Sequence, residues 1–224
     1  RVRLLENNSS NNSGAGIRVN NWTNTRVDDA TMVASRAGEL GSDILANGRG
    51  IEVTLGDALL PNNGWNQNLV VQGANIDSNN GLGVRATVNG VGTTMNTQII
   101  DNISISGNGG GGIRLTGIGG STHNAIIENS AAGVGNTTLD MLGNGASGIA
   151  IVAGDVAGGN TGSVHAIIRN VDIIGSGNHG IDVSISDDGQ ATVFVEDVAS
   201  QFNSGNGMNI VSDTVGDSLA GAVS

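Results

Sequence analysis

Short runs of alternating apolar and polar residues recur along the whole chain. The clearest is GIDVSIS, in which Ile181, Val183 and Ile185 alternate with polar residues. A period of two places the apolar side chains on one face of a β-strand and the polar ones on the other. No helical pattern separates these runs. The pattern therefore predicts an all-β chain of short strands.

Most of these strands open with one motif: a glycine, an aliphatic residue or methionine, a free position and a second, usually aliphatic residue. Its seven copies begin at Gly16, Gly50, Gly83, Gly112, Gly148, Gly180 and Gly207. Successive copies lie 34, 33, 29, 36, 32 and 27 residues apart. Self-similarity at this period indicates a solenoid, because a single repeat cannot bury its apolar edge alone. We expect one domain, residues 1–224, of about seven stacked coils.

A second motif is an aliphatic run that ends in asparagine, as in IIDN, IIEN and IIRN. It places Asn102, Asn129 and Asn170 at one point of the repeat, and Asp197 continues the column in VFVED. We interpret this column as a structural ladder at a bend, in which each amide bonds the coils above and below. The competing interpretation is a sugar or metal site, but a ligand site would be local rather than repeated.

The glycine that opens each motif has two explanations. It occupies either a turn that needs a positive φ or a place where stacked backbones come close together. The apolar pair that follows it, such as Ile113 and Leu115, is expected to stack in columns inside the coil.

Two segments, IIDNISISGNGGGGIRL (residues 99–115) and IIRNVDIIGSGNHGIDV (residues 167–183), resemble the repeat of right-handed parallel β-helix proteins. This is the pectate-lyase-like architecture, and the likeness is greatest to large secreted bacterial proteins and adhesins built from tandem coils. The resemblance covers nearly the whole chain, more loosely between Asn20 and Asn47. It implies a right-handed, single-stranded parallel β-helix and an extracellular or cell-surface location. The architecture hosts lyases, hydrolases and adhesins, so the likeness alone does not choose a function.

Composition excludes several classes of partner. The net charge is −11, and all nine basic residues are arginine, so nucleic acid is not an expected partner. The absence of cysteine excludes disulfides and thiolate metal sites. No apolar run approaches the length of a membrane span.

The free positions of the seven glycine motifs form an outward-facing row: Arg18, Glu52, Arg85, Arg114, Ala150, Asp182 and Asn209. Its mixed charges predict mainly a solvated face. Arg85 beside Arg114 is the one unbalanced step, and this pair could hold a carboxylate or sulfate of an acidic polysaccharide. His179 and Asp182 occupy the freest positions of their coil. We take these four as the candidate binding residues.

No catalytic constellation emerges. NHGIDVSISDDG invites comparison with β-helix polygalacturonases, but Asp187 and Asp188 follow the His-Gly step instead of preceding it, and the chain has no lysine. Asp-Asp-Gly is more simply a tight turn, so these two residues are only weak candidates for a calcium site. His123 and His165 lack the spacing of a metal site, and we expect both at the surface.

These patterns favour a non-catalytic extracellular module, such as a stalk, surface-layer or fibre component with an adhesive or glycan-contacting role. We expect no cofactor, and neighbouring repeats or further copies stacked end to end as partners, with polysaccharide as a possible ligand. DTVGDSLAGAVS begins another coil without a polar cap, so we expect an excerpt of a longer array. The alternative is a polysaccharide lyase or glycoside hydrolase acting on acidic polysaccharide. That function needs carboxylates, or carboxylates with arginine, on adjacent coils of one sheet.

Overall fold

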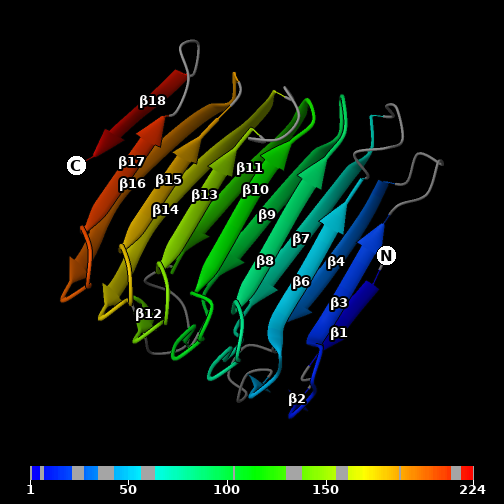
Figure 1. The fold of residues 1–224 in the computed structure, drawn as a ribbon. Helices are drawn as coiled ribbons and strands as arrows, with labels where there is room; N and C mark the ends of the chain where they lie inside the picture. The colour runs from blue at the N-terminus through cyan, green and yellow to red at the C-terminus, as the bar shows by residue number, and fades with distance from the viewer. Residues whose placement is uncertain are drawn as a thin grey trace.

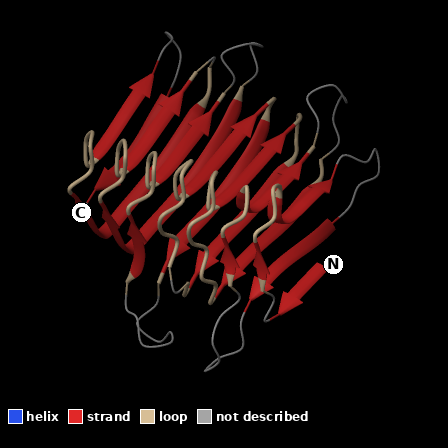
Figure 2. Cartoon of the chain, turned by 60° about the horizontal axis from the view of Figure 1, so that its bottom comes forward, coloured by secondary structure: helices blue, strands red, loops and turns tan. Residues whose placement is uncertain are grey.

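The computed structural model is a parallel β-solenoid (Figure 1). It describes residues 2–5, 8–21, 28–34, 43–56, 64–102, 104–129, 138–154, 161–186, 188–212 and 218–223. Every paired strand in these ranges is parallel, and none of the described residues is helical. The turns of successive coils line up in a row along one edge of the solenoid (Figure 2).

Two sheets form the main walls. The long sheet contains, in spatial order, β1 (Val2–Leu5), β4 (Asp28–Ala34), β7 (Asn66–Gln72), β9 (Thr94–Ile100), β11 (Ser121–Glu128), β14 (Gly162–Ile174), β16 (Gln190–Gln201) and β18 (Ser218–Val223), with β12 (Leu139–Leu142) beside β14. The second sheet contains β3 (Ala15–Asn21), β6 (Arg49–Leu55), β8 (Val84–Asn89), β10 (Ile113–Ile118), β13 (Ile149–Ala153), β15 (Ile181–Ile185) and β17 (Met208–Ser212). A narrower third face is made by β2 (Ser9–Ser10), β5 (Ile44–Leu45) and single bridges that link Asp43, Asn75, Ser104 and Asp140.

The glycine motifs stack as the sequence predicts. Each of the seven supplies one strand of the second sheet, and Ile51, Val84, Ile113, Ile149 and Ile181 follow one another in register. The solenoid has about five turns, slightly fewer than the seven coils expected; five of the seven strands have a neighbour on both sides. The parallel β-helix is thus confirmed, and its right-handedness stays a prediction.

The core fills the space between the sheets with aliphatic side chains. Ile113, Leu115, Ile149 and Ile151 have no exposed surface, as their place in the predicted columns requires. Stacked rungs of this kind bury each apolar side chain against the coils on both sides, which gives a chain with few aromatic residues a continuous core.

Close approach of backbones explains the motif glycines. None of the seven has a positive φ. A Cβ atom on Gly83 would lie 2.8 Å from the carbonyl oxygen of Gly112, and equally close to Asn108 Nδ2 and Ile105 Cγ2. The second of the two explanations therefore holds for the six motif glycines from Gly16 to Gly180, where atoms of a neighbouring coil occupy the place of a Cβ, whereas a Cβ on Gly207 would meet only ordinary contacts at 3.6 Å or more.

The asparagines of the second motif bond from coil to coil. Asn102 Oδ1 accepts from the backbone N–H of Ala74 (2.9 Å), and Asn129 Oδ1 accepts from that of Asn102 (3.0 Å). Asn170 Nδ2 donates to the carbonyl oxygen of Asn129 (2.9 Å). Asp197 is exposed, and its φ of 51° matches the φ of Asn170, so both occupy the same left-handed bend.

A second, more deeply buried asparagine ladder lies at the next bend of each coil, between the third face and the second sheet. Asn79 donates to Asn108 Oδ1 from both its backbone N–H (3.1 Å) and its Nδ2 (2.9 Å), and Asn108 repeats both bonds to Asn144 Oδ1 (3.0 and 3.2 Å). The Nδ2 atoms also donate to backbone carbonyls of the preceding coil, as Asn108 does to Ile76 (2.9 Å). Asn47 extends the ladder at its N-terminal side, where its backbone N–H donates to Asn79 Oδ1 (2.9 Å).

Ser176 interrupts this ladder. It follows Asn144 in the column, and its backbone N–H donates to Asn203 Oδ1 (2.9 Å), as a ladder asparagine does. Its hydroxyl is completely buried and has no hydrogen-bond partner among the described residues. The position therefore has the surroundings of the ladder without its amide.

Completing the ladder with Ser176→Asn is expected to raise the free energy of unfolding by about 1 kcal/mol, because the new amide can bond the coils on both sides. Urea unfolding of the variant and the parent chain measures the change. Ser184→Asn on the half-buried outer side of β15 is the control, and we expect it to have little effect. A destabilised Ser176→Asn would show that the column has no room for a longer side chain there.

Candidate functional site

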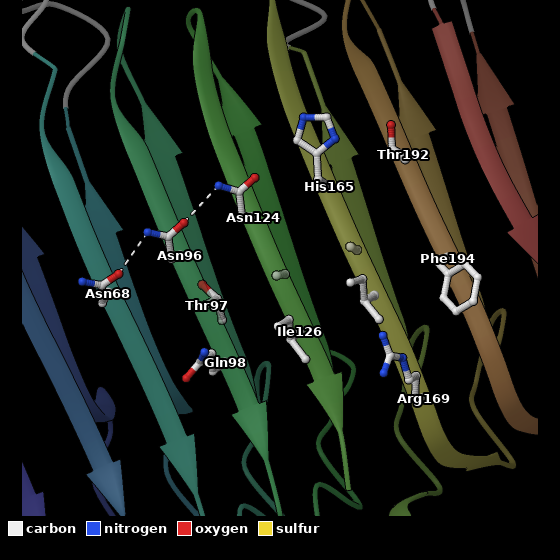
Figure 3. Close-up of a pocket in the computed structure, with 13 residues that line it drawn as sticks. Asn68, Asn96, Thr97, Gln98, Asn124, Ile126, His165, Arg169, Thr192 and Phe194 are labelled. Atoms are coloured by element: carbon white, nitrogen blue, oxygen red, sulfur yellow. Dashed lines mark hydrogen bonds between the residues drawn. The ribbon is translucent and has the colours of Figure 1, made fainter. Parts of the chain in front are cut away.

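A broad groove crosses the outer face of the long sheet. Its volume is about 860 Å³, and it runs over strands β7, β9, β11, β14 and β16 (Figure 3). Outward side chains of these strands stand in register, so they form rows along the solenoid axis, with one residue per coil. Three rows differ in chemistry, and together they make this face the candidate functional site.

The first row is polar. Asn124 Nδ2 donates to Asn96 Oδ1, and Asn96 Nδ2 donates to Asn68 Oδ1, both at 3.0 Å (Figure 3). His165 and Thr192 continue the row on the next two coils, and both are exposed. Unlike the buried ladders, this row presents amide, imidazole and hydroxyl groups to solvent.

The second row is apolar where the groove is best defined. Ile126, Ile167 and Phe194 stand in register on β11, β14 and β16, and all three are only half-buried. Phe194 is one of only two phenylalanines in the chain. The row leaves a strip of aliphatic and aromatic surface beside the polar row.

The third row is charged. Arg169 lies between Glu128 and Glu196, with 3.8 Å from its Nη1 to a Glu128 oxygen and 3.5 Å from its Nε to a Glu196 oxygen. Its guanidinium also lies 5.9 Å from the centre of the Phe194 ring. The three residues immediately precede the anchors Asn129, Asn170 and Asp197. That fixed offset is the signal that could have revealed them in the sequence.

This charged row limits the chemistry of the groove. It contains two carboxylates and one guanidinium, and Arg169 pairs with both acids. The acids lie two coils apart, which corresponds to about 9–10 Å between their backbones. Exposed ion pairs of this kind contribute little to stability, so the row's main effect is on the charge that the groove presents.

Three of the four candidate residues from the sequence lie on the other sheet, and His179 lies in the turn that precedes its strand β15. Arg85 and Arg114 stand in register on β8 and β10, but Arg85 Nη1 bonds Glu52 Oε1 at 3.2 Å. Glu52 is almost fully buried beneath Arg18, Arg49 and Arg85. What the sequence suggested as a solvated position is therefore a carboxylate enclosed by three guanidinium groups, and Arg85 is already engaged.

Asp182 and His179 are likewise engaged within the solenoid. Asn209 Nδ2 donates to Asp182 Oδ1 (2.9 Å), and the backbone N–H of Asn206 donates to His179 Nδ1 (2.9 Å). Ala150 separates Arg114 from Asp182 in the row. The structure thus places Arg85, Arg114 and Asp182 in one row of the second sheet and His179 in the turn before β15, and the partners of Arg85, Asp182 and His179 lie within the solenoid.

The weak calcium candidates gain no support. Asp187 lies outside the described residues, and Asp188 is an exposed turn residue with a φ of 58°. Within the described ranges, no three His, Asp or Glu side chains gather as a metal-ion site would require.

On the third face, burial raises the pKa of the Asp77 carboxyl. The Ser106 N–H and the Ser104 hydroxyl donate hydrogen bonds to this carboxyl and act in the opposite direction.

The expectation of a surface position is wrong for His123 and correct for His165. In β11, His123 points into the core, whereas the neighbouring Asn124 lies on the outer face, in register with His165 of β14. His123 Nε2 contacts Thr97 Oγ1 at 2.8 Å, and its Nδ1 contacts the carbonyl oxygen of Thr116 at 3.2 Å. Burial lowers the pKa of His123 to about 4, partly offset by the bond to Thr116.

His123 is expected to make the fold sensitive to acid. The unfolded chain binds a proton at this imidazole near pH 6.5, and the folded chain binds it only near pH 4. The free energy of unfolding therefore falls by about 3 kcal/mol as the pH is lowered from 6.5 to 4. Urea unfolding at pH 7 and pH 4.5 should show a smaller loss in His123→Met than in the parent chain. Equal losses in the two proteins would contradict the assignment.

Comparisons of the chain with protein-family models, curated proteins and solved structures found no match. Among the described residues no helix is long and apolar enough to cross a bilayer.

Proposed function

We propose that this chain is a rigid, non-catalytic structural module of an extracellular fibre, stalk or surface layer, extended by stacking coil upon coil. The observation that supports it is the use of the buried polar groups. The two asparagine ladders, at Asn102 and at Asn108, consist of bonds between successive coils. Such a design stiffens one axis and repeats along it.

The C-terminal edge has the surface that a further coil would cover. Ile210 of β17 stands in register with the buried Val183, yet 45 % of it is exposed, and Val211 is 48 % exposed. The outer edge of β17 also has no strand paired to it among the described residues. A neighbouring repeat, or a second copy presenting β3, would continue the second sheet there.

Charge is distributed so that unlike ends attract. The first 49 residues hold six of the nine arginines and five acids, whereas residues 170–224 hold eight acids and no arginine or lysine. Contact between two acidic C-terminal ends is disfavoured relative to a head-to-tail contact. A head-to-tail interface does not close on itself, so it builds filaments rather than dimers.

Sedimentation velocity over a wide range of protein concentration tests this proposal. We expect a ladder of oligomers that weakens at high salt, and we expect Ile210→Lys to abolish it while leaving the urea midpoint unchanged. Val91→Lys, at an exposed turn residue, is the matched control. A chain that stays monomeric at every concentration, or a variant that associates as the parent does, would refute end-to-end stacking.

A second candidate function is favoured by the row of Glu128, Arg169 and Glu196. It provides carboxylates and an arginine on adjacent coils of one sheet, which a β-helix lyase or hydrolase acting on acidic polysaccharide requires. The test is incubation with polygalacturonate, with and without Ca²⁺, followed by ultraviolet absorbance of unsaturated products and by reducing ends. Turnover that is lost in Arg169→Ala would replace the non-catalytic proposal.

A further inference from the structure

We propose that the groove on the long sheet binds an extended, uncharged polysaccharide chain that lies along the solenoid axis. This inference gives the module an adhesive ligand. It stands separately from end-to-end stacking, because every side chain that carries it lies within strands β7 to β16.

The groove pairs two kinds of surface that a sugar chain needs. Pyranose rings have apolar C–H faces and hydroxyl groups at their edges. The strip of Ile126, Ile167 and Phe194 offers the apolar and aromatic contact, and the adjacent row of Asn96, Asn124 and its neighbours offers amide donors and acceptors. Apolar contact with a few placed polar groups is the usual composition of a ligand site.

Charge selects among the possible occupants. Among the described residues, Arg169 is the only Asp, Glu, Lys or Arg side chain that lines the groove, and it is already paired with Glu128 and Glu196 beside it. The whole chain has a net charge of −11, so a polyanion would be repelled at low and moderate salt. A polyuronate also finds no free cationic pair here, whereas an uncharged chain meets no charge penalty.

The repeat favours a polymer over a compact ligand. Each row presents one side chain per coil at about 4.8 Å, and the polar and apolar rows run parallel to each other. A linear chain along the axis therefore meets similar contacts at successive units. A peptide strand could not be added to this face by sheet pairing, because β9, β11 and β14 are already paired on both sides.

Affinity electrophoresis tests the proposal with hydroxyethylcellulose and glucomannan as uncharged probes and polygalacturonate as the charged probe. Ile210→Lys serves as the background, so that stacking does not affect mobility. We expect at least one uncharged polymer to retard the chain. Phe194→Leu, which keeps apolar contact but removes the ring, and Asn124→Ala should each weaken binding about tenfold. Arg114→Ala, on the second sheet, should bind as the background does.

Circular dichroism and the urea midpoint establish that each variant is folded. Absence of retardation by both uncharged polymers would overturn the proposal. Retardation that survives both groove variants would overturn the location. Retardation by polygalacturonate that depends on Arg169 would overturn the assignment of an uncharged ligand and favour the lyase or hydrolase alternative. None of these results decides whether the chain stacks.

Discussion

Replacing Asn108 with aspartate is expected to lower the free energy of unfolding by about 4 kcal/mol. The two side chains have nearly the same shape, so packing is not the cause. Asn108 Nδ2 donates to the carbonyl oxygen of Ile76 and to Asn144 Oδ1, both of which are acceptors. A carboxylate oxygen would face them without a proton, inside a fully buried column.

Asn96→Asp provides the matched control. Asn96 also accepts from one amide and donates to another, but it does so on the solvent-facing row of the long sheet. We expect it to cost less than about 1 kcal/mol, because water can solvate the new charge. Urea unfolding measures both changes, and equal losses at the two positions would show that burial does not set the strength of the ladder.

The pH dependence gives Asn108→Asp a second signature. A protonated carboxyl can donate to Ile76 or Asn144 as the amide did, so the difference between this variant and the parent chain should shrink as the pH is lowered. The comparison cancels the loss from His123, which both proteins share. A difference that stays constant with pH would indicate that the variant acts through packing instead.

The strands of the second sheet can be predicted from the sequence alone, because the motif that marks each strand is local and recurs on every coil. An inward residue such as Ile113 must be apolar on every coil, and the glycine before it cannot be replaced without moving the next coil. Both constraints appear as a motif in one dimension. The handedness of the solenoid is different, because neither the motif nor its spacing predicts it. The right-handed prediction rests only on the resemblance to right-handed parallel β-helix proteins.

The deeper asparagine ladder was missed because asparagine close to glycine is also the ordinary composition of a turn. Asn79, Asn108 and Asn144 each precede the motif glycine by four residues, which distinguishes them from free turn residues. In the second motif, Asn102 was recognised because three aliphatic or acidic residues precede it and make the run conspicuous.

The groove was missed for a different reason. Its rows consist of residues of unlike type, such as Asn124, His165 and Thr192, which no motif unites. Only the register of the long sheet brings them together. Conversely, Arg85, Arg114 and Asp182, which the sequence suggested as binding residues, do form a row on the second sheet. The pairing of Arg85 with Glu52, however, depends on side-chain geometry that the spacing of the motifs does not contain.

Replacing Gly83 with alanine is expected to lower the free energy of unfolding by about 3–4 kcal/mol. The new Cβ would lie 2.8 Å from the carbonyl oxygen of Gly112, a backbone atom that cannot rotate away, and as close to Asn108 Nδ2 and Ile105 Cγ2. Relief of these contacts would spread two coils and stretch the hydrogen bond from Val84 N–H to the Gly112 oxygen, now 2.9 Å.

Gly14→Ala is the control for this prediction, because a Cβ there meets no atom within 4 Å. It should leave stability unchanged or raise it by less than about 1 kcal/mol, since alanine reduces the freedom of the unfolded chain. Urea unfolding of the two variants separates close stacking from glycine's general flexibility. If Gly83→Ala were as stable as Gly14→Ala, coil spacing would be adjustable, and the recurrence of glycine in the seven motifs would need a cause other than stacking.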